Sequence, residues 1–316
     1  MSLSEAPVVA QVYRNGFLES VHRGLVAVTR PEGSVSFHRG DPETPILPRS
    51  SAKPIQALAM VRCGLNLPPD QLALACASHS GESYHLETVR RILAEAGVDE
   101  SALQNTPDYP LIDAYRFAWI AAGKPISALA QNCSGKHAAM LATCQHNGWP
   151  LATYLTRGHP LQQAVAETIR SFGATITITS TDGCGAPIQA ISLADLARIF
   201  GRLAAATEGP EREVADAMRS FPANVGGTGR DVTDLMQSVP GLIAKDGAEG
   251  VYAVGLPDGR GIALKIADGN PRARPVLMSA VLQRLWIGDS ALRTRLSKQS
   301  VLGHGQPVGA VVPVGI

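Results

Sequence analysis

The chain has 316 residues, a formal net charge of +1 at pH 7 and an aromatic content of only 5%. A nearly neutral chain without a run of five like charges lacks the basic surface that nucleic acids and anionic membranes attract. We therefore expect the partner to be a small molecule or a second copy of the same chain, with no nucleic acid and no membrane involved.

The N-terminal residues MSLSEAPVVAQVYRNG show no basic segment followed by an apolar one, and no stretch of eighteen apolar residues occurs. We therefore expect a cytoplasmic protein. The five cysteines are an odd number in a long chain, which favours free thiols or metal ligands over a complete disulfide framework.

The two ends of the chain have the pattern of antiparallel strands. Residues 8–16 and 22–40 contain apolar, β-branched runs, and RPEG supplies a turn within the second segment. Residues 250–270 repeat this pattern around PDGRG. The part between is mostly helical in period, as in residues 193–200, where apolar side chains recur three and four residues apart after Ser192, a plausible N-cap.

These patterns predict an α+β fold in which an antiparallel sheet is built from both chain termini and covered by helical layers. No long Pro-, Ser- or Gly-rich linker divides the chain. We therefore predict one domain over residues 1–316, with room for two lobes: a sheet lobe from both termini and a helical lobe between them.

The stretch RSSAK, residues 49–53, places serines close to a lysine at the expected start of a helix. Ser50 and Lys53 are three residues apart, a spacing that puts a hydroxyl and an amine on one helical face, whereas Ser51 would point elsewhere. Pro54 suits the first turn of a helix, and an amine beside a serine can take its proton. The spacing predicts a nucleophile and its base. The alternative is a serine that only caps the helix, next to a solvated lysine.

A second reactive stretch is CASHSGE, residues 76–82, which follows the apolar run QLALACA. We interpret the run as a strand that ends in a loop exposing Ser78 and His79. The alternative is an ordinary helix start, in which Ser80 or Ser83 is the cap.

Two further stretches, QNCSGKH (131–137) and STDGCGAP (180–187), each bring one cysteine. Cys133 and Cys184 are too far apart in sequence to form a C-x-x-C pair, so a zinc site would have to combine both loops. The alternative is a pair of buried, inert cysteines.

Taken together, the ordered stretches RSSAKP, CASHSGE, NCSGKH, TDGCG, KDGAEG and ALKIADGN resemble the bacterial asparaginase II family, the thermolabile or rhizobial-type L-asparaginases, over about residues 8–310. That family is similar in fold to serine β-lactamases, penicillin-binding proteins and serine glutaminases. The sequence departs from the family in having SHSGE where other members can carry SHSSE. It also lacks the K-T-G and S-D-N triplets of true β-lactamases.

The resemblance implies two Ser/Lys pairs, one formed by Ser50 and Lys53 and the other by Ser78 and Lys265. We expect Ser50 to be the nucleophile, because Lys53 is already near it in sequence, and Ser78 with Lys265 to relay protons or bind the substrate carboxylate. Backbone amides of the RSSAK or CASHS loop would hold the oxyanion.

The resemblance also implies one zinc per chain, held by Cys133, Lys136 and Cys184 with one position left for water, in a role that is more positional than catalytic. Asp182 would orient this cluster and contact the substrate ammonium group. The remaining residues assigned to substrate binding are Arg49, His79 and Gly183.

The expected reaction is hydrolysis of the side-chain amide of L-asparagine to L-aspartate and ammonia, by a chain that the resemblance implies to be a homodimer. A serine glutaminase or a penicillin-interacting hydrolase would use the same Ser/Lys chemistry. A zinc-binding module without enzymatic activity would need only the two cysteines and Lys136, and would leave the Ser/Lys pairs without a role.

Overall fold

The structure, a computed structural model, describes residues 3–316 and divides the chain into two compact units. Among the described residues, unit 1 comprises 3–51, 191–205 and 234–316, so it combines both ends of the chain with one central segment. Unit 2 comprises residues 52–190 and 206–233. Whether the two units behave as the single domain expected from the sequence stays a prediction.

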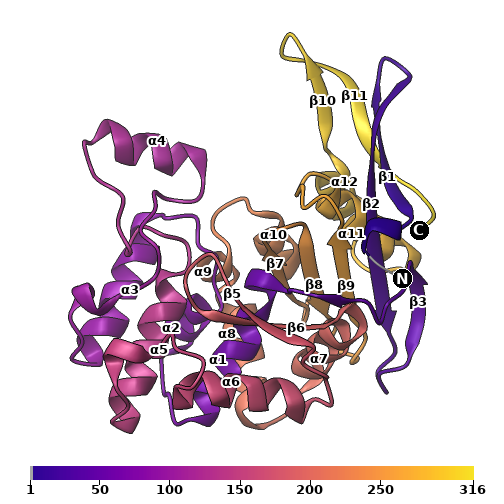
Figure 1. Cartoon of the computed structure of the whole chain (residues 1–316). Helices are drawn as coiled ribbons and strands as arrows, with labels where there is room; N and C mark the ends of the chain where they lie inside the picture. Colours follow the sequence, from indigo (N-terminus) through magenta and orange to yellow (C-terminus); the bar gives the residue numbers. More distant parts are fainter. Residues whose placement is uncertain (1–2) are drawn as a thin grey trace. The chain divides into compact units, whose positions relative to one another are not determined.

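Unit 1 is built on an antiparallel sheet of eight strands in the order β10-β11-β1-β2-β9-β8-β7, with β3 pairing to β2. Strands from the beginning of the chain therefore lie beside strands from its end, as the indigo and yellow ribbons of Figure 1 show. The strands are β1 Val8–Arg14, β2 Phe17–Thr29, β3 Val35–Arg39, β7 Ile243–Gly247, β8 Val251–Gly255, β9 Gly261–Ile266, β10 Ser300–Gly303 and β11 Gln306–Pro313.

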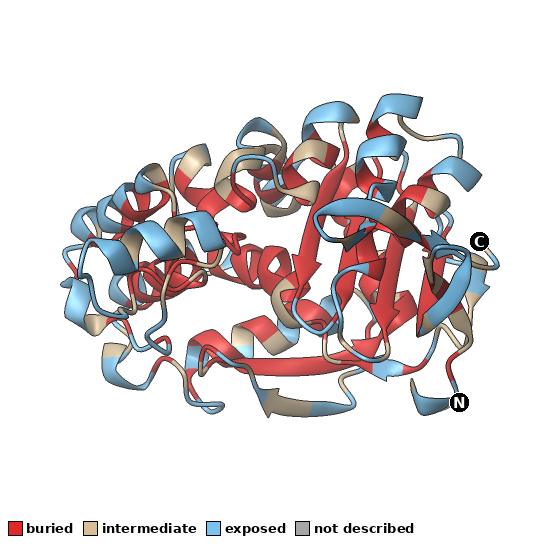
Figure 2. Ribbon diagram, turned by 90° about the horizontal axis from the view of Figure 1, so that it is seen from above, coloured by how far each residue is buried: buried red, intermediate tan, exposed pale blue. Residues whose placement is uncertain are grey.

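The register of this sheet confirms the predicted α+β fold with a sheet made from both termini. Tyr13 on β1 lies opposite Leu18 on β2 and opposite Ala310 on β11, and Leu25 on β2 lies opposite Lys265 on β9. Figure 2 shows that buried residues predominate along the central strands of the sheet. In the short strand β4 (Pro45–Ile46), Ile46 pairs with Ile191.

Helix α7 (Leu193–Ala205) covers this sheet, and Ser192 caps it as predicted, with its Oγ accepting a hydrogen bond from the Asp195 amide at 3.0 Å. Two strand glycines allow the helix backbone to lie directly on the sheet. A Cβ at Gly255 would fall 2.0 Å from the Phe200 carbonyl oxygen, and one at Gly261 would fall 1.8 Å from that of Ala197. The other helices of unit 1 are α11 Ala273–Arg284 and α12 Ser290–Ser297.

Unit 2 is mainly helical. Strand β5 (Ile178–Thr181) pairs with the first residues of β6 (Pro187–Ser192), and helix α10 (Asp231–Ser238) begins at the end of this unit. The helices of unit 2 are α1 Lys53–Arg62, α2 Pro69–Ala75, α3 Ser83–Glu95, α4 Asp113–Ala121, α5 Ser134–Asn147, α6 Pro160–Ser171, α8 Gly209–Ser220 and α9 Pro222–Val225. Within the described residues, no helix combines the length and apolarity needed to cross a membrane.

In unit 2, one local prediction was wrong, and so was the cap residue named in the alternative to it. The run QLALACA lies mostly in helix α2 rather than in a strand, because Gln, Leu and Ala are strong helix formers and Pro69 and Asp70 suit its first turn. The N-cap of α3 is Glu82, not Ser80 or Ser83. Glu82 forms a reciprocal capping box with His85, whose Nδ1 accepts from the Glu82 amide at 3.2 Å.

Candidate active site

In unit 2, the amine of Lys53 lies within hydrogen-bonding distance of a serine. Lys53 is the first residue of α1, with Pro54 in the first helical turn, and its side chain is buried. Its Nζ donates to Ser78 Oγ at 3.1 Å and to the Ala77 carbonyl oxygen at 2.5 Å. A serine hydroxyl in contact with an amine is the arrangement from which proton transfer to a base can occur.

Ser78 is held in place by its backbone and is only 5% exposed. Its amide donates to the Val225 carbonyl at 3.1 Å, and its carbonyl accepts from Arg230 Nη1 at 3.1 Å. The structure thus brings Ser78 to Lys53, a contact that the predicted pairs did not contain. The pairing of Ser50 with Lys53 and of Ser78 with Lys265 stays a prediction.

His79 is completely buried beside this contact. Its Nε2 shares a hydrogen bond with Ser134 Oγ at 2.8 Å, and its ring stacks on His85 with centroids 5.2 Å apart. Burial, then the nearby His85, Lys53 and Arg230, lower the pKa of His79 well below its usual value, so the imidazole is neutral. Its predicted role in substrate binding stays a prediction.

The two serines of RSSAK, both in unit 1, have different environments. They lie in a 3-10 turn, Arg49–Ala52, rather than in the α-helix itself. Ser50 is half-buried, whereas Ser51 is fully buried and donates from Oγ to the Lys245 carbonyl at 3.0 Å. Ser50 is therefore the more accessible of the two.

Lys265, on β9 of unit 1, donates from Nζ to the Glu249 carbonyl. Burial lowers the pKa of Lys265, and the charge of Arg49 acts in the same direction, while Glu249 opposes both. The carboxylate of Glu249 lies 3.8 Å from Arg49 Nη1. Arg49 and Glu249 both have positive φ, 51° and 58°, a conformation that costs energy in residues other than glycine and that gathers at functional sites.

The predicted metal ligands come together in unit 2. Cys133 and Cys184 form a buried cluster with Ala186, and Lys136 Nζ lies 3.1 Å from Cys184 Sγ. The hydrogen bond from Cys184 lowers the pKa of Cys133 well below its usual value, against the effect of burial, and the same bond raises the pKa of Cys184. Burial alone would lower the pKa of Lys136, but the two cysteines raise it. These groups form one thiolate–ammonium cluster.

The donor set is compatible with zinc, because two sulfur ligands and one amine from two loops leave a fourth position open. The amine would have to lose its proton on binding. Only two of the three ligands belong to the usual metal-binding residue types, and among residues 3–316 no three His, Cys, Asp or Glu side chains gather as a metal site. Zinc therefore remains a proposal.

The other predicted contacts of this loop are less enclosed. Asp182 is half-buried, with Oδ2 4.0 Å from Cys184 Sγ, and Gly183 is exposed, with its carbonyl accepting from Thr106 Oγ1 at 2.9 Å. Asp182 thus lies beside the cysteine cluster, as its predicted orienting role requires, while contact with substrate stays a prediction for both.

A buried cluster of charges in unit 1 was not predicted from the sequence. Lys245 Nζ lies 2.6 Å from Asp246 Oδ1, and Arg274 Nη1 lies 3.6 Å from Asp246 Oδ2. The signal was present in KDGAEG, where two charged residues continue an apolar strand, but Arg274 is remote in sequence. Arg230, which holds the Ser78 carbonyl, was also missed and carries no local sequence signal.

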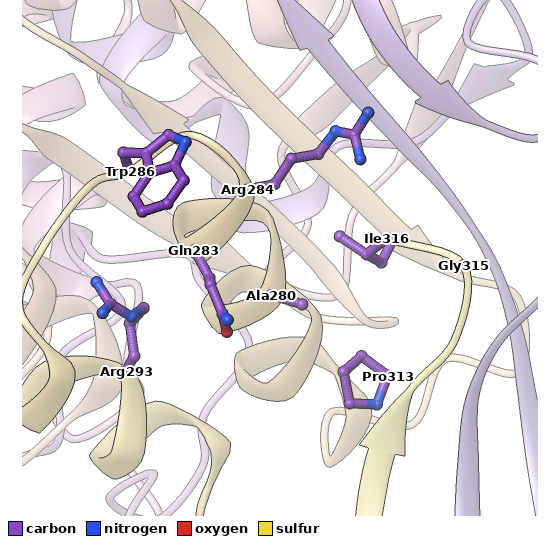
Figure 3. A pocket seen from close by; sticks show the side chains of 8 residues that line it. All are labelled: Ala280, Gln283, Arg284, Trp286, Arg293, Pro313, Gly315 and Ile316. Carbon is purple, nitrogen blue, oxygen red and sulfur yellow. The ribbon is translucent and has the colours of Figure 1, made fainter.

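The size of surface hollows does not locate this site. A hollow of about 490 Å³ in unit 1 is lined by Trp286, Arg284, Arg293 and neighbouring residues (Figure 3), and none of the predicted site residues lies in it. The arrangement of reactive groups is therefore the better guide to function.

The fold and the site place this chain in the class of α+β proteins that contain a buried serine–lysine contact. Similar solved structures include a β-lactamase from Mycobacterium bovis, 19% identical, covering 89% of this chain and 97% of that chain with a TM-score of 0.48. A Bacillus glutaminase is 15% identical, covers 84% and 91%, and has a TM-score of 0.37. Simvastatin synthase from Aspergillus terreus is 10% identical, covers 77% and 86%, and has a TM-score of 0.41.

The sequence model of the L-asparaginase II family matches residues 10–313, almost the whole chain. The chain belongs to the L-asparaginase II family, as the sequence resemblance predicted, and this membership supports amidohydrolase activity. No curated protein sequence matches it.

Proposed function

We propose that this protein hydrolyses the side-chain amide of L-asparagine to L-aspartate and ammonia by serine–lysine catalysis. The observation that carries the proposal is the hydrogen bond between Lys53 Nζ and Ser78 Oγ, because it supplies a base in contact with a hydroxyl. Membership of the L-asparaginase II family supports an amide as the substrate. The choice of the asparagine side chain depends on the description of that family alone.

Ser50 is the proposed nucleophile and Ser78 the proposed proton relay. Ser50 is half-buried, whereas Ser78 is 5% exposed and fixed on both sides of its backbone, so a substrate can reach Ser50 more readily. Lys53 follows Ser50 by three residues in the sequence and forms a hydrogen bond with Ser78. We therefore propose that Lys53 exchanges protons with Ser50, either directly or through Ser78.

The proposed reaction has two steps. Ser50 Oγ bonds to the side-chain amide carbon as its proton moves to the Lys53 amine, and the C–N bond then breaks as that proton passes to the leaving nitrogen, giving ammonia and an ester on Ser50. Water then attacks the ester carbon, giving up a proton to Lys53, and the ester bond breaks as that proton returns to Ser50. The products are aspartate and free enzyme.

The oxyanion is better placed at the RSSAK turn than at the CASHS loop. The amides of Ser78 and His79 already donate to the carbonyls of Val225 and Asn132. Because both amides already donate hydrogen bonds within the protein, we propose that the Ser50 amide helps to stabilise the oxyanion of the reacting amide group.

A zinc ion would be held by Cys133, Lys136 and Cys184, and when bound it would fix the geometry of the two loops and attract a negatively charged substrate group. Lys265 and Arg49 are proposed to bind the substrate carboxylate, since both are cations on unit 1. The proposal also keeps the cytoplasmic location expected from the sequence and the homodimer that the family resemblance implies.

A substrate panel tests this function. Purified protein should release ammonia from L-asparagine at a much higher kcat/KM than from L-glutamine, and it should not open a chromogenic β-lactam. A preference for glutamine would support the glutaminase alternative, and β-lactam turnover without ammonia release would support the penicillin-interacting one. Zinc binding without turnover of any of the three would support the non-enzymatic module.

A further inference from the structure

Ser51 is buried, follows the proposed nucleophile Ser50 in the sequence, and forms a hydrogen bond with strand β7. Its amide donates to the Pro48 carbonyl at 3.1 Å, and its Oγ donates to the Lys245 carbonyl at 3.0 Å. Because Ser51 is fully buried and its hydroxyl is engaged, it can anchor the turn but cannot readily meet a substrate.

The turn and the strand are also in close packing contact. A Cβ at Gly247 would lie 2.7 Å from the Pro48 carbonyl oxygen and 3.1 Å from Ser51 Oγ. Only a residue without a side chain allows β7 to approach the turn this closely. A small displacement of the strand end would therefore displace residues 48–51.

A cluster of charges fixes the same strand end. The Asp246 carboxylate lies between Lys245 and Arg274, at 2.6 Å and 3.6 Å, and Arg274 also donates to the Gly247 carbonyl at 3.2 Å. The Arg274 guanidinium lies over the Tyr252 ring, 5.2 Å from its centroid. All four side chains are buried, so removing the carboxylate would leave two buried cations next to each other.

The conformation of the turn explains why such an anchor is needed. Arg49 has a φ of 51°, which a non-glycine residue keeps only when its surroundings enforce it. Ser50 lies between this strained residue and the anchored Ser51. Without the anchor, the turn can relax and move the Ser50 hydroxyl.

We propose that Ser51 and the Lys245–Asp246–Arg274 cluster are positioning residues that hold the Ser50-bearing turn in its reactive conformation. The proposal rests on the proposed function in taking Ser50 as the nucleophile. It also gives the second serine of RSSAK a role different from that of the first.

The test compares Ser51→Ala with a matched control, Ser279→Ala. Ser279 is also buried and also donates from Oγ to a backbone carbonyl, that of Arg293 at 2.9 Å, on helix α11. Three quantities are measured: kcat and KM for ammonia release from asparagine, and the rate at which a fluorophosphonate labels the Ser50 peptide, located by mass spectrometry.

Ser51→Ala should lower kcat and the labelling rate by about 10- to 100-fold with little change in KM, as expected when a reacting group is misplaced. Ser279→Ala should keep both rates near those of the wild type. Wild-type rates in a folded Ser51→Ala variant would overturn the proposal, and so would an equal loss in both variants.

If Ser51→Ala does not fold, Gly247→Ala decides, because its methyl group pushes on the turn without removing a hydrogen bond or a charge. A lowered kcat and labelling rate would support the proposal, and wild-type rates would overturn it. A wild-type protein that is labelled at Ser50 but releases no ammonia would contradict the proposed substrate, while the labelling rates would still decide the positioning role. A wild-type protein that is not labelled at Ser50 would overturn both.

Discussion

Lys53 Nζ and Ser78 Oγ lie 3.1 Å apart, although the two residues are separated by 25 positions in the sequence. The helix α1 supplies the amine at its first residue, and the loop after α2 supplies the hydroxyl. This contact joins Lys53 to Ser78 through the fold, whereas the pairing of Lys53 with Ser50 is a prediction from sequence spacing.

The first prediction separates the two serines. A slow asparagine analogue should leave its acyl group on the peptide containing Ser50, and Ser50→Ala should abolish the adduct. Ser78→Ala should still form the adduct, more slowly, because a relay and not the nucleophile has been removed. Peptide mass spectrometry locates the group. An adduct on the Ser78 peptide that persists in Ser50→Ala would reverse the two roles.

The second prediction concerns Lys265 and its neighbour Glu249. Burial lowers the pKa of Lys265 and the Glu249 charge raises it, so Glu249→Gln should lower this pKa further. If protonated Lys265 binds the substrate carboxylate, the alkaline limb of the kcat/KM profile should move to lower pH in Glu249→Gln. Glu19→Gln removes another glutamate of unit 1, one that pairs with Arg14, and should leave the limb in place. An unmoved limb in Glu249→Gln would exclude this role.

The third prediction concerns zinc. Elemental analysis of metal-replete protein should find about one zinc per chain, and Cys133→Ser should lose most of it because two thiolates and one amine supply all the protein ligands. Cys63→Ser, which changes a half-buried cysteine outside the cluster, should keep its zinc. Protein prepared with zinc but containing none would contradict the site. Full activity in a zinc-free Cys133→Ser variant would contradict the positional role.

The fourth prediction concerns the pH dependence of stability. Burial lowers the pKa of both His79 and His85, so both stay neutral in the folded protein at a pH where the unfolded chain, with a histidine pKa near 6.5, binds protons. Their contribution to stability is therefore fully present above pH 6.5 and is lost as the pH falls below it. Each histidine contributes a slope of at most about 1.4 kcal/mol per pH unit.

Chemical denaturation between pH 7.5 and pH 5 checks this slope. His79→Gln should give a shallower loss of unfolding free energy with falling pH than the wild type. His38→Gln, at an exposed position, should retain the wild-type slope. Equal slopes in all three proteins would show that His79 does not have a lowered pKa.

The sheet of unit 1 was predictable because its information is local. Apolar alternation and turn residues mark β1, β2, β8 and β9 in the sequence, and the sheet from both termini was predicted because these strand patterns lie near the two ends with mostly helical patterns between them. Helix α2 was not predicted because the periodicity of an apolar run of seven residues is compatible with both a buried strand and a buried helix. The Gln, Leu and Ala residues of the run favour the helix.

The site was only partly predictable for a related reason. Individual residues such as Ser50, Lys53 and Cys133 could be selected from ordered short stretches, but their partners depend on how distant segments pack. The contact of Lys53 with Ser78, and the packing of Arg274 against Asp246, join segments whose spacing follows no local rule. A sequence can therefore suggest the reactive groups before it can pair them.

The most direct test of serine–lysine amide hydrolysis is ammonia release from L-asparagine by the wild type and by Lys53→Met, measured side by side. Methionine keeps the apolar stem of a buried side chain, so the melting temperature should change little, while kcat should fall by about 10²- to 10⁴-fold because a positioned base is lost. Lys53→Arg should be no more active, since a guanidinium stays protonated. A folded Lys53→Met variant that keeps most of the wild-type rate would contradict the account.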